Sequence, residues 1–268
     1  MRHTALLLSA TACMLLASGC SDSREDEIEG YVERANAIQE GATPELGRAN
    51  EAYARFADGE LPSERAPVDL AAAESSIRAT RAELAEIEPP SDARTLHVHL
   101  LRFFDLSIEL SHETTRLARY LPAAEAALQE LAPASRRLAR DLRSASGPAG
   151  QERGLARYRR PLERALSRLR RLEPPPVLVA SHRAQVRRLR SLRSLAIRLG
   201  RAIRERDARE VARLLLRFRR RQGEAGQAPG LDARSRRAYQ ERHRTTEREA
   251  VAVRREQARI QHELRTEG

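Results

Sequence analysis

The apolar residues of this chain recur three and four positions apart, and this period constrains the fold more than any other feature. Between residues 179 and 204 it produces one stripe, formed by Val186, Leu189, Leu192, Ala196, Leu199 and Ile203. A period near 3.6 places such a stripe on one face of an α-helix. No Asn-Gly or Asp-Gly pair is flanked by strand-like alternation of apolar and polar residues. The chain is therefore predicted to be all-α.

Proline and glycine divide this pattern into helices. Gly41 is expected to end a first helix, and Pro44 and Pro122 are expected to open new ones, because proline is tolerated in the first turn of a helix. The predicted helices cover about 25–40, 43–59, 67–88, 91–120, 122–143, 151–173, 179–204, 207–222 and a last segment that reaches the C-terminus. Short connections between them favour an antiparallel bundle.

An internal repeat with an offset of 85 residues organises these helices. Glu88-Pro89-Pro90 matches Glu173-Pro174-Pro175 without a gap, and His97 in the next helix matches His182. Repeated helical pairs bury their apolar faces by stacking on one another. The predicted fold is thus an antiparallel helical bundle built from two helix–Pro-Pro elbow–helix units, with a basic helix added at the C-terminus.

The first twenty residues have the pattern of a secretory leader. A short positive start, Arg2-His3, precedes an apolar stretch that is too short to span a bilayer. The sequence Leu16-Ala17-Ser18-Gly19-Cys20 resembles the lipobox of bacterial lipoproteins, with Ala17 where Leu is commoner. The resemblance implies a signal peptide over 1–19, a diacylglycerol on Cys20 and a tether over 20–24. The alternative is an ordinary secretory leader with a chance cysteine.

A second resemblance lies in the elbows. The segments from Leu84 to His97 and from Leu169 to His182 share the pattern L-x-x-L-x-P-P followed by His. This pattern resembles helical lipoproteins of high-GC Gram-positive bacteria. It implies a location on the extracytoplasmic face of the cell membrane, and it implies no activity.

Charge is distributed unevenly along the chain. All 49 basic residues are Arg. Residues 21–134 carry a net charge of −12, whereas residues 135–268 carry +22. We therefore expect an acidic helical unit over 25–147, a basic unit over 148–228 and an Arg-rich C-terminal helix over 229–268. Such asymmetry indicates either an anionic partner or two halves that neutralise each other.

The helix predicted over 207–222 is the best candidate for contact with an anionic surface. Its apolar stripe of Val211, Leu214, Leu215 and Phe218 is bordered by basic residues, as in helices that lie on anionic membranes. The candidate contact residues are Arg209, Arg213, Arg217, Arg219, Arg220 and Arg221. Anionic lipid, a wall polymer or a protein is the expected partner, and nucleic acid is not. The alternative is that these arginines form a solvated face.

The histidines offer a second function. His97 and His182 could form a ligand- or metal-responsive sensor, because imidazole titrates near neutral pH. The alternative is structural, with each ring donating to carbonyls left open where the preceding helix ends at Pro89-Pro90 or Pro174-Pro175. The single E-x-x-H, Glu109 to His112, is expected to be a solvated face rather than a metal site.

No enzyme is expected. The sequence contains no G-x-S-x-G, phosphate-binding loop or H-E-x-x-H motif, and the one cysteine after the leader is the predicted lipidation site. No cofactor is predicted. The sequence favours a lipid-anchored, non-enzymatic binding or scaffolding module at the cell envelope, with the His sensor as the alternative.

Overall fold

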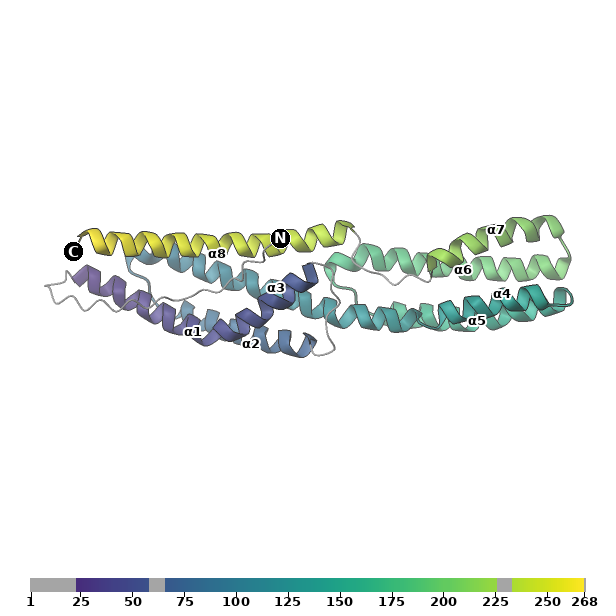
Figure 1. The fold of residues 1–268 in the computed structure, drawn as a ribbon, viewed down its shortest axis with the longest axis horizontal. Helices are drawn as coiled ribbons and strands as arrows, with labels where there is room; N and C mark the ends of the chain where they lie inside the picture. The colour runs from purple at the N-terminus through teal and green to yellow at the C-terminus, as the bar shows by residue number, and fades with distance from the viewer. Residues whose placement is uncertain (1–22, 58–65, 226–232, 268) are drawn as a thin grey trace. The chain divides into compact units, whose positions relative to one another are not determined.

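A computed structural model describes residues 23–57, 66–225 and 233–267. The described residues are almost entirely helical and include no strand, which confirms the all-α prediction (Figure 1). The helices are α1 (Ser23–Ala57), α2 (Ala66–Ala85), α3 (Arg94–Leu128), α4 (Leu131–Ser144), α5 (Pro148–Arg171), α6 (Val179–Glu205), α7 (Ala208–Ala225) and α8 (Ala233–Glu267). Two short 3₁₀ helices, η1 (Ser91–Ala93) and η2 (Pro176–Leu178), precede α3 and α6. The predicted signal peptide and Cys20 lie outside the described residues.

The chain divides into two compact units. Unit 1 comprises residues up to Ala118 together with residues from Arg236 onward, and unit 2 comprises Arg119–Ser235. The sequence-based division was different in two places. The segment 119–147, expected in the acidic unit, belongs to unit 2, and most of the C-terminal helix, expected to be separate, belongs to unit 1. Unit 1 therefore contains basic residues from the C-terminal end of the chain as well as the acidic residues of the N-terminal half.

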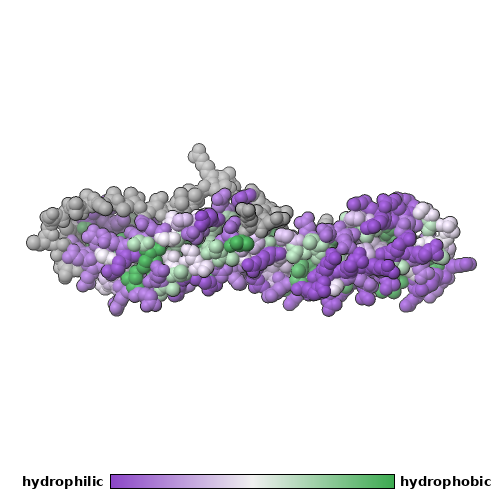
Figure 2. Space-filling model, turned by 90° about the horizontal axis from the view of Figure 1, so that it is seen from below, coloured by the Kyte–Doolittle hydropathy of each residue, from purple (hydrophilic) through white to green (hydrophobic). Residues whose placement is uncertain are grey.

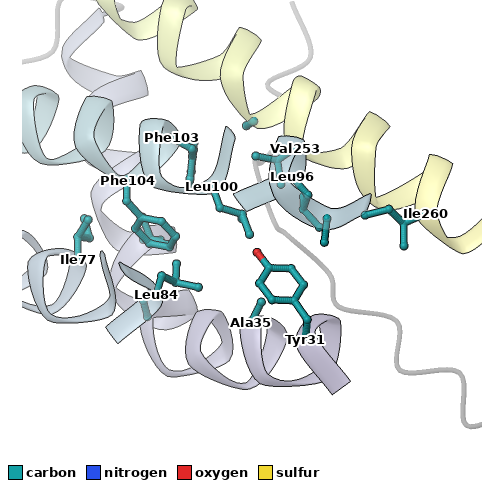
Figure 3. Packing of buried hydrophobic residues seen from close by; sticks show 14 of the residues in the cluster. Tyr31, Ala35, Ile77, Leu84, Leu96, Leu100, Phe103, Phe104, Val253 and Ile260 are labelled. Carbon is teal, nitrogen blue, oxygen red and sulfur yellow. The ribbon is translucent and has the colours of Figure 1, made fainter. Parts of the chain in front are cut away.

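Unit 1 is a four-helix bundle of α1, α2, α3 and α8. Helices α1 and α3 run parallel. Arg24 contacts Asp92 just before α3, and the later residue Tyr31 contacts the later residue His97. Helix α8 runs antiparallel to α3, since Arg259 contacts Asp92 in η1, just before α3, and Tyr239 contacts Thr114 in a later turn of α3. The core between them is apolar and includes Tyr31, Ile77, Leu84, Leu96, Leu100, Phe104, Val253 and Ile260 (Figure 3).

The predicted break in the first helix is wrong, because α1 continues through Gly41 and Pro44. The reason is visible in its buried positions, which keep the spacing of three and four residues across the proline: Ile28, Tyr31, Ala35, Gln39, Ala42, Leu46, Ala49 and Tyr53. Burial of one continuous stripe outweighs the hydrogen bond that Pro44 cannot make. Residues 23 and 24, expected in the tether, already belong to α1.

Pro122 likewise lies inside a helix rather than opening one. Helix α3 runs to Leu128, and α4 begins three residues later at Leu131. Leu117, Leu121, Ala124, Leu128, Leu131, Ala134 and Leu138 are all buried and continue one stripe through the proline and through the short break. The last turns of α3 and α4 together therefore form the first helix of unit 2.

Unit 2, like unit 1, consists of two helices, a Pro-Pro elbow with a 3₁₀ helix, and two further helices. Helix α5 runs antiparallel to α4, as the ion pairs Glu130–Arg164 and Asp141–Arg157 show. Helices α6 and α7 form a hairpin whose turn begins at Arg206, a residue in the left-handed conformation (φ 55°). The predicted stripe of α6 is confirmed, since all six of its residues are buried.

The helices at the two elbows begin at positions that differ by the same 85 residues as the sequence repeat. The 3₁₀ helices η1 and η2 begin at Ser91 and Pro176, and helices α3 and α6 begin at Arg94 and Val179. The α3 positions of Ser107, Ser111, Thr114 and Thr115 correspond to Leu192, Ala196, Leu199 and Gly200 in α6, and all eight are buried. Unit 1 therefore has polar residues where unit 2 has an apolar interior.

Candidate functional site

The first buried histidine after each Pro-Pro elbow forms a pair with a buried tyrosine from an earlier helix. In unit 1 the Tyr31 hydroxyl lies 3.1 Å from Nδ1 of His97, and in unit 2 the Tyr120 hydroxyl lies 2.8 Å from Nδ1 of His182. All four side chains are buried, and the rings of each pair are tilted against each other. Burial raises the pKa of both tyrosines to about 12, so each hydroxyl keeps its proton and can donate it to the imidazole.

This geometry corrects the expected partner of the histidines. Neither Nδ1 donates to an open carbonyl of the preceding helix; each bonds to a tyrosine on the helix that runs parallel to its own. The carbonyl of Asp92 in η1 instead accepts from Arg259 of α8, and that of Val177 in η2 accepts from Ser235. The scarcity of tyrosine in the sequence is the signal that could have pointed to these partners. All five tyrosines are buried, and two of them serve the matched histidines.

The histidine pairs predict a loss of stability in mild acid. Burial lowers the pKa of His97 and His182 below the ordinary 6.5, and Arg183 lowers that of His182 further. A lowered pKa in the folded state means that the unfolded chain binds more protons, so stability falls as the pH drops below about 6.5. Urea denaturation at pH 7.5 and 5.5 should show this loss in the natural chain. The double variant His97→Gln and His182→Gln should show a smaller loss, and equal losses would contradict the assignment.

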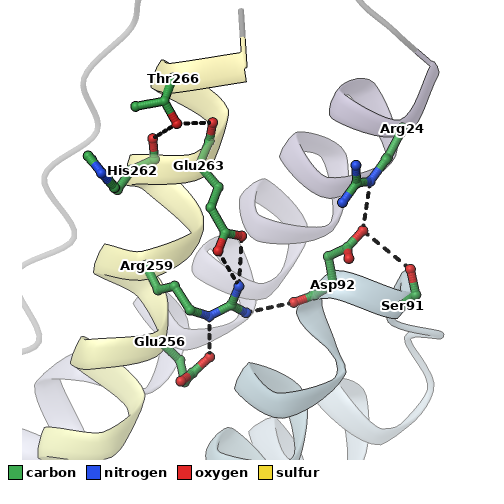
Figure 4. A network of polar contacts seen from close by, with 8 residues as sticks. All are labelled: Arg24, Ser91, Asp92, Glu256, Arg259, His262, Glu263 and Thr266. Carbon is green, nitrogen blue, oxygen red and sulfur yellow. Dashed lines mark hydrogen bonds and ion pairs between the residues drawn. The ribbon is translucent and has the colours of Figure 1, made fainter.

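The polar network that holds η1 joins three parts of unit 1 (Figure 4). Arg259 donates to Glu256, to Glu263 and to the carbonyl of Asp92. The Asp92 side chain accepts from Arg24 at 3.0 Å, and this guanidinium lowers the pKa of Asp92. All of these polar groups serve the packing of α1 and α8 against the elbow, which indicates a structural role.

The predicted contact arginines all lie on the solvent side of α7. Arg209, Arg213, Arg217, Arg219, Arg220 and Arg221 are exposed. Arg213 forms a two-pronged ion pair with Glu210. The apolar stripe of this helix is not exposed, because Leu214 and Phe218 are buried and Phe218 packs edge-on against Tyr158 of α5. Leu214 and Phe218 therefore pack inside the bundle, and contact with an anionic surface stays a prediction for the exposed arginines.

One apolar side chain of α7 does face solvent. Leu216 is 74% exposed, the largest value among the exposed large hydrophobic residues that the structure describes. It lies three residues after Arg213 and one before Arg217, on the basic side of the helix. A leucine surrounded by guanidinium groups is typical of interfacial helices, in which the apolar side chain enters the headgroup region of the bilayer.

The basic surface extends beyond α7 over the rest of unit 2. Residues 119–235 contain 29 Arg and 11 acidic residues, a net charge of +18, whereas residues 21–118 and 236–268 together carry −8. Hydrophilic residues dominate the visible face of this unit (Figure 2). Many of its exposed arginines have no carboxylate partner among the described residues, including Arg136, Arg137, Arg140, Arg160, Arg170, Arg171, Arg187, Arg190, Arg217 and Arg219. This surface is the strongest candidate for a functional site.

Unit 1 contains a buried carboxylate that sequence reasoning missed. The side chain of Glu113 on α3 is 4% exposed and forms an ion pair with Arg242 of α8. Burial raises the pKa of Glu113, and the opposite charge of Arg242 works against that rise. The neighbouring Tyr239 hydroxyl lies 2.8 Å from Oγ1 of Thr114. Since these residues are 125 and 129 positions apart, no local pattern could have revealed them.

The acidic and histidine side chains of the described residues are not grouped as metal ligands. Within 23–57, 66–225 and 233–267, no three His, Cys, Asp or Glu side chains are grouped so that they could hold a metal ion. Glu109 and His112 are both exposed, and His112 lies 3.6 Å from Glu74. None of the helices in these ranges is long and apolar enough to cross a membrane.

Comparisons of the chain with protein families, with curated proteins and with solved structures give no match.

Proposed function

We propose that this protein is a lipid-anchored, non-enzymatic helical module of the extracytoplasmic membrane face, and that unit 2 docks on anionic lipid. The single observation that carries the proposal is the charge of unit 2, which contains 29 arginines and only 11 acidic residues. A net charge of this size attracts anionic surfaces strongly. Arginine also donates two parallel hydrogen bonds to phosphate, which lysine cannot do.

One observation and the proposed anchor favour lipid over a wall polymer. The exposed Leu216 lies among arginines, where it can enter the interfacial region of a bilayer but gains nothing from a hydrated polymer. The proposed anchor at Cys20 would also hold unit 2 close to a bilayer, so that a weak second contact acts at a high effective concentration. The histidine sensor has less support, because the Nδ1 atoms of His97 and His182 both bond to tyrosine.

The anchor is tested by Cys20→Ser. We expect this variant to incorporate no labelled fatty acid and to accumulate as uncleaved precursor, because its serine cannot form the thioether that holds the diacylglycerol. Growth with a radiolabelled or clickable fatty acid, followed by gel analysis, measures both effects. Lipid incorporated by the variant at the level of the natural chain would overturn the proposed anchor.

Docking is tested on the chain of residues 21–268, which keeps every helix between Ser23 and Glu267. We expect this chain to bind vesicles that contain phosphatidylglycerol and not to bind vesicles of phosphatidylcholine alone. Binding should weaken steeply between 50 and 300 mM salt, since ions screen exposed charges over about 8 Å at physiological ionic strength. Leu216→Ser should weaken binding to vesicles and leave binding to a soluble anionic polymer unchanged. No salt-sensitive binding to the anionic vesicles would contradict the proposed function.

A further inference from the structure

A shallow groove between α5 and α6 carries a distinct group of arginines. It has a volume of about 450 Å³ and is lined by Glu163, Leu166, Ser167, Arg170, Arg171 and Arg193. The five α5 residues are spaced by three, four, seven and eight positions, which places them along one face of that helix. Leu166 is buried and forms the apolar floor, whereas the three arginines are exposed.

Only one of the three guanidinium groups in the groove is paired with a carboxylate of the described residues, so the other two can bind an anion. Nε of Arg193 donates to Oε1 of Glu163 at 3.3 Å, and Arg159 lies 3.6 Å from the same oxygen. Glu163 thus positions Arg193 beside the α5 face. Arg170 and Arg171 have no carboxylate partner among the described residues. Three guanidinium groups and one carboxylate leave the groove with a net charge of +2.

The equivalent face of unit 1 lacks this arrangement. At an offset of 85 residues, Arg170, Arg171 and Arg193 correspond to Ala85, Glu86 and Ile108. The two arginines present on that face are already paired, Arg78 with Glu74 and Arg81 with Asp105. Packing of the two helices therefore does not require arginine at these positions, because the corresponding helices pack without it.

We infer that the α5–α6 groove binds the phosphodiester group of an anionic phospholipid. Phosphate oxygens match the planar, two-pronged geometry of the guanidinium group, and the +2 charge favours a phosphodiester whose headgroup adds no positive charge. Arg170 and Arg171 contact the phosphate directly, and Glu163 acts as a positioning residue for Arg193. The inference rests on the proposed function and assigns the place on unit 2 where a headgroup is held.

The test compares two variants that remove the same charge from the same unit. The groove variant carries Arg170→Gln, Arg171→Gln and Arg193→Gln. The control carries Arg136→Gln, Arg137→Gln and Arg140→Gln on α4, whose arginines are exposed and unpaired among the described residues. Residues 21–268 of each chain are sedimented with vesicles of phosphatidylglycerol and phosphatidylcholine. We expect the groove variant to bind at least tenfold more weakly than the control.

A second readout follows the arginine side chains themselves. Short-chain phosphatidylglycerol, below its micelle concentration, should shift the Nε–Hε signals of Arg170 and Arg171 in the ¹⁵N-labelled chain, whereas inorganic phosphate at equal concentration should shift them less. Equal vesicle binding by the two variants would overturn the groove inference and leave the proposed function intact. Equal shifts with inorganic phosphate would also overturn it, as they would point to free phosphate. If the natural chain binds no anionic vesicle, the proposed function fails as well.

Discussion

Arg242→Ala should destabilise unit 1 by about 2–3 kcal/mol. Removal of one partner from a buried ion pair typically costs about 3–5 kcal/mol, because the other charge remains buried without compensation. Glu113 is almost fully buried, but the Arg242 side chain is 52% exposed, and the solvent around it reduces the expected effect. Urea denaturation followed by circular dichroism measures the loss. Arg248→Ala is the control, since Arg248 pairs with Glu241 where both side chains are exposed, and it should cost less than about 1 kcal/mol.

The same variant should acquire a distinct pH dependence. Burial raises the pKa of Glu113, and Arg242 is the largest influence that lowers it. A carboxyl whose pKa is raised in the folded state stabilises the fold at low pH, and this stability is lost as the pH rises through the raised value. The destabilisation by Arg242→Ala should therefore be greater at pH 7 than at pH 4.5. Addition of Glu113→Gln should recover part of it at pH 7. A pH-independent loss would show that Arg242 acts by packing rather than by charge.

Removal of four arginines from unit 2 should weaken binding to anionic vesicles by roughly two to three orders of magnitude. The variant carries Arg187→Gln, Arg190→Gln, Arg217→Gln and Arg219→Gln, all at exposed positions of α6 and α7. Each basic residue close to an anionic membrane surface contributes about 1 kcal/mol, or about fivefold in affinity. The buried stripes of α6 and α7 are untouched, so the helical content should not change.

A matched variant of unit 1 distinguishes a docking surface from a mere effect of net charge. Arg34→Gln, Arg94→Gln, Arg254→Gln and Arg255→Gln also remove four positive charges from exposed positions. Vesicle sedimentation at 100 mM salt should show that this variant loses much less affinity than the unit 2 variant. Equal losses would mean that the whole molecule, rather than unit 2, is attracted to the membrane.

Local features of the fold could be predicted because they depend on neighbouring residues. The stripe from Val186 to Ile203 and the elbows at Pro89-Pro90 and Pro174-Pro175 are local patterns, and the structure places helix boundaries beside them. The prolines were misinterpreted for a physical reason. Pro44 and Pro122 carry a local preference for helix starts, whereas the apolar stripe that continues past each of them depends on packing against other helices.

Long-range features could not be predicted. Tyr31 and Tyr120 bond to histidines 66 and 62 positions further along the chain, and Glu113 pairs with a residue 129 positions away. The candidate arginines of α7 were found from the sequence, because their spacing places them around a buried stripe. The groove was not found, since it needs Arg193 of α6 beside the face of α5 that carries Arg170 and Arg171.

The most direct test of the central claim is to ask which unit touches the membrane. The chain has two cysteines, Cys13 and Cys20, so residues 21–268 have none, and a fluorophore can be attached at single engineered positions. Ser144→Cys and Ser194→Cys place it on exposed positions of unit 2, and Ser75→Cys places it on an exposed position of unit 1. With vesicles of phosphatidylglycerol that carry a headgroup quencher, we expect quenching of a unit 2 label and little change at residue 75. Quenching at residue 75 without quenching at 144 or 194 would contradict docking through unit 2.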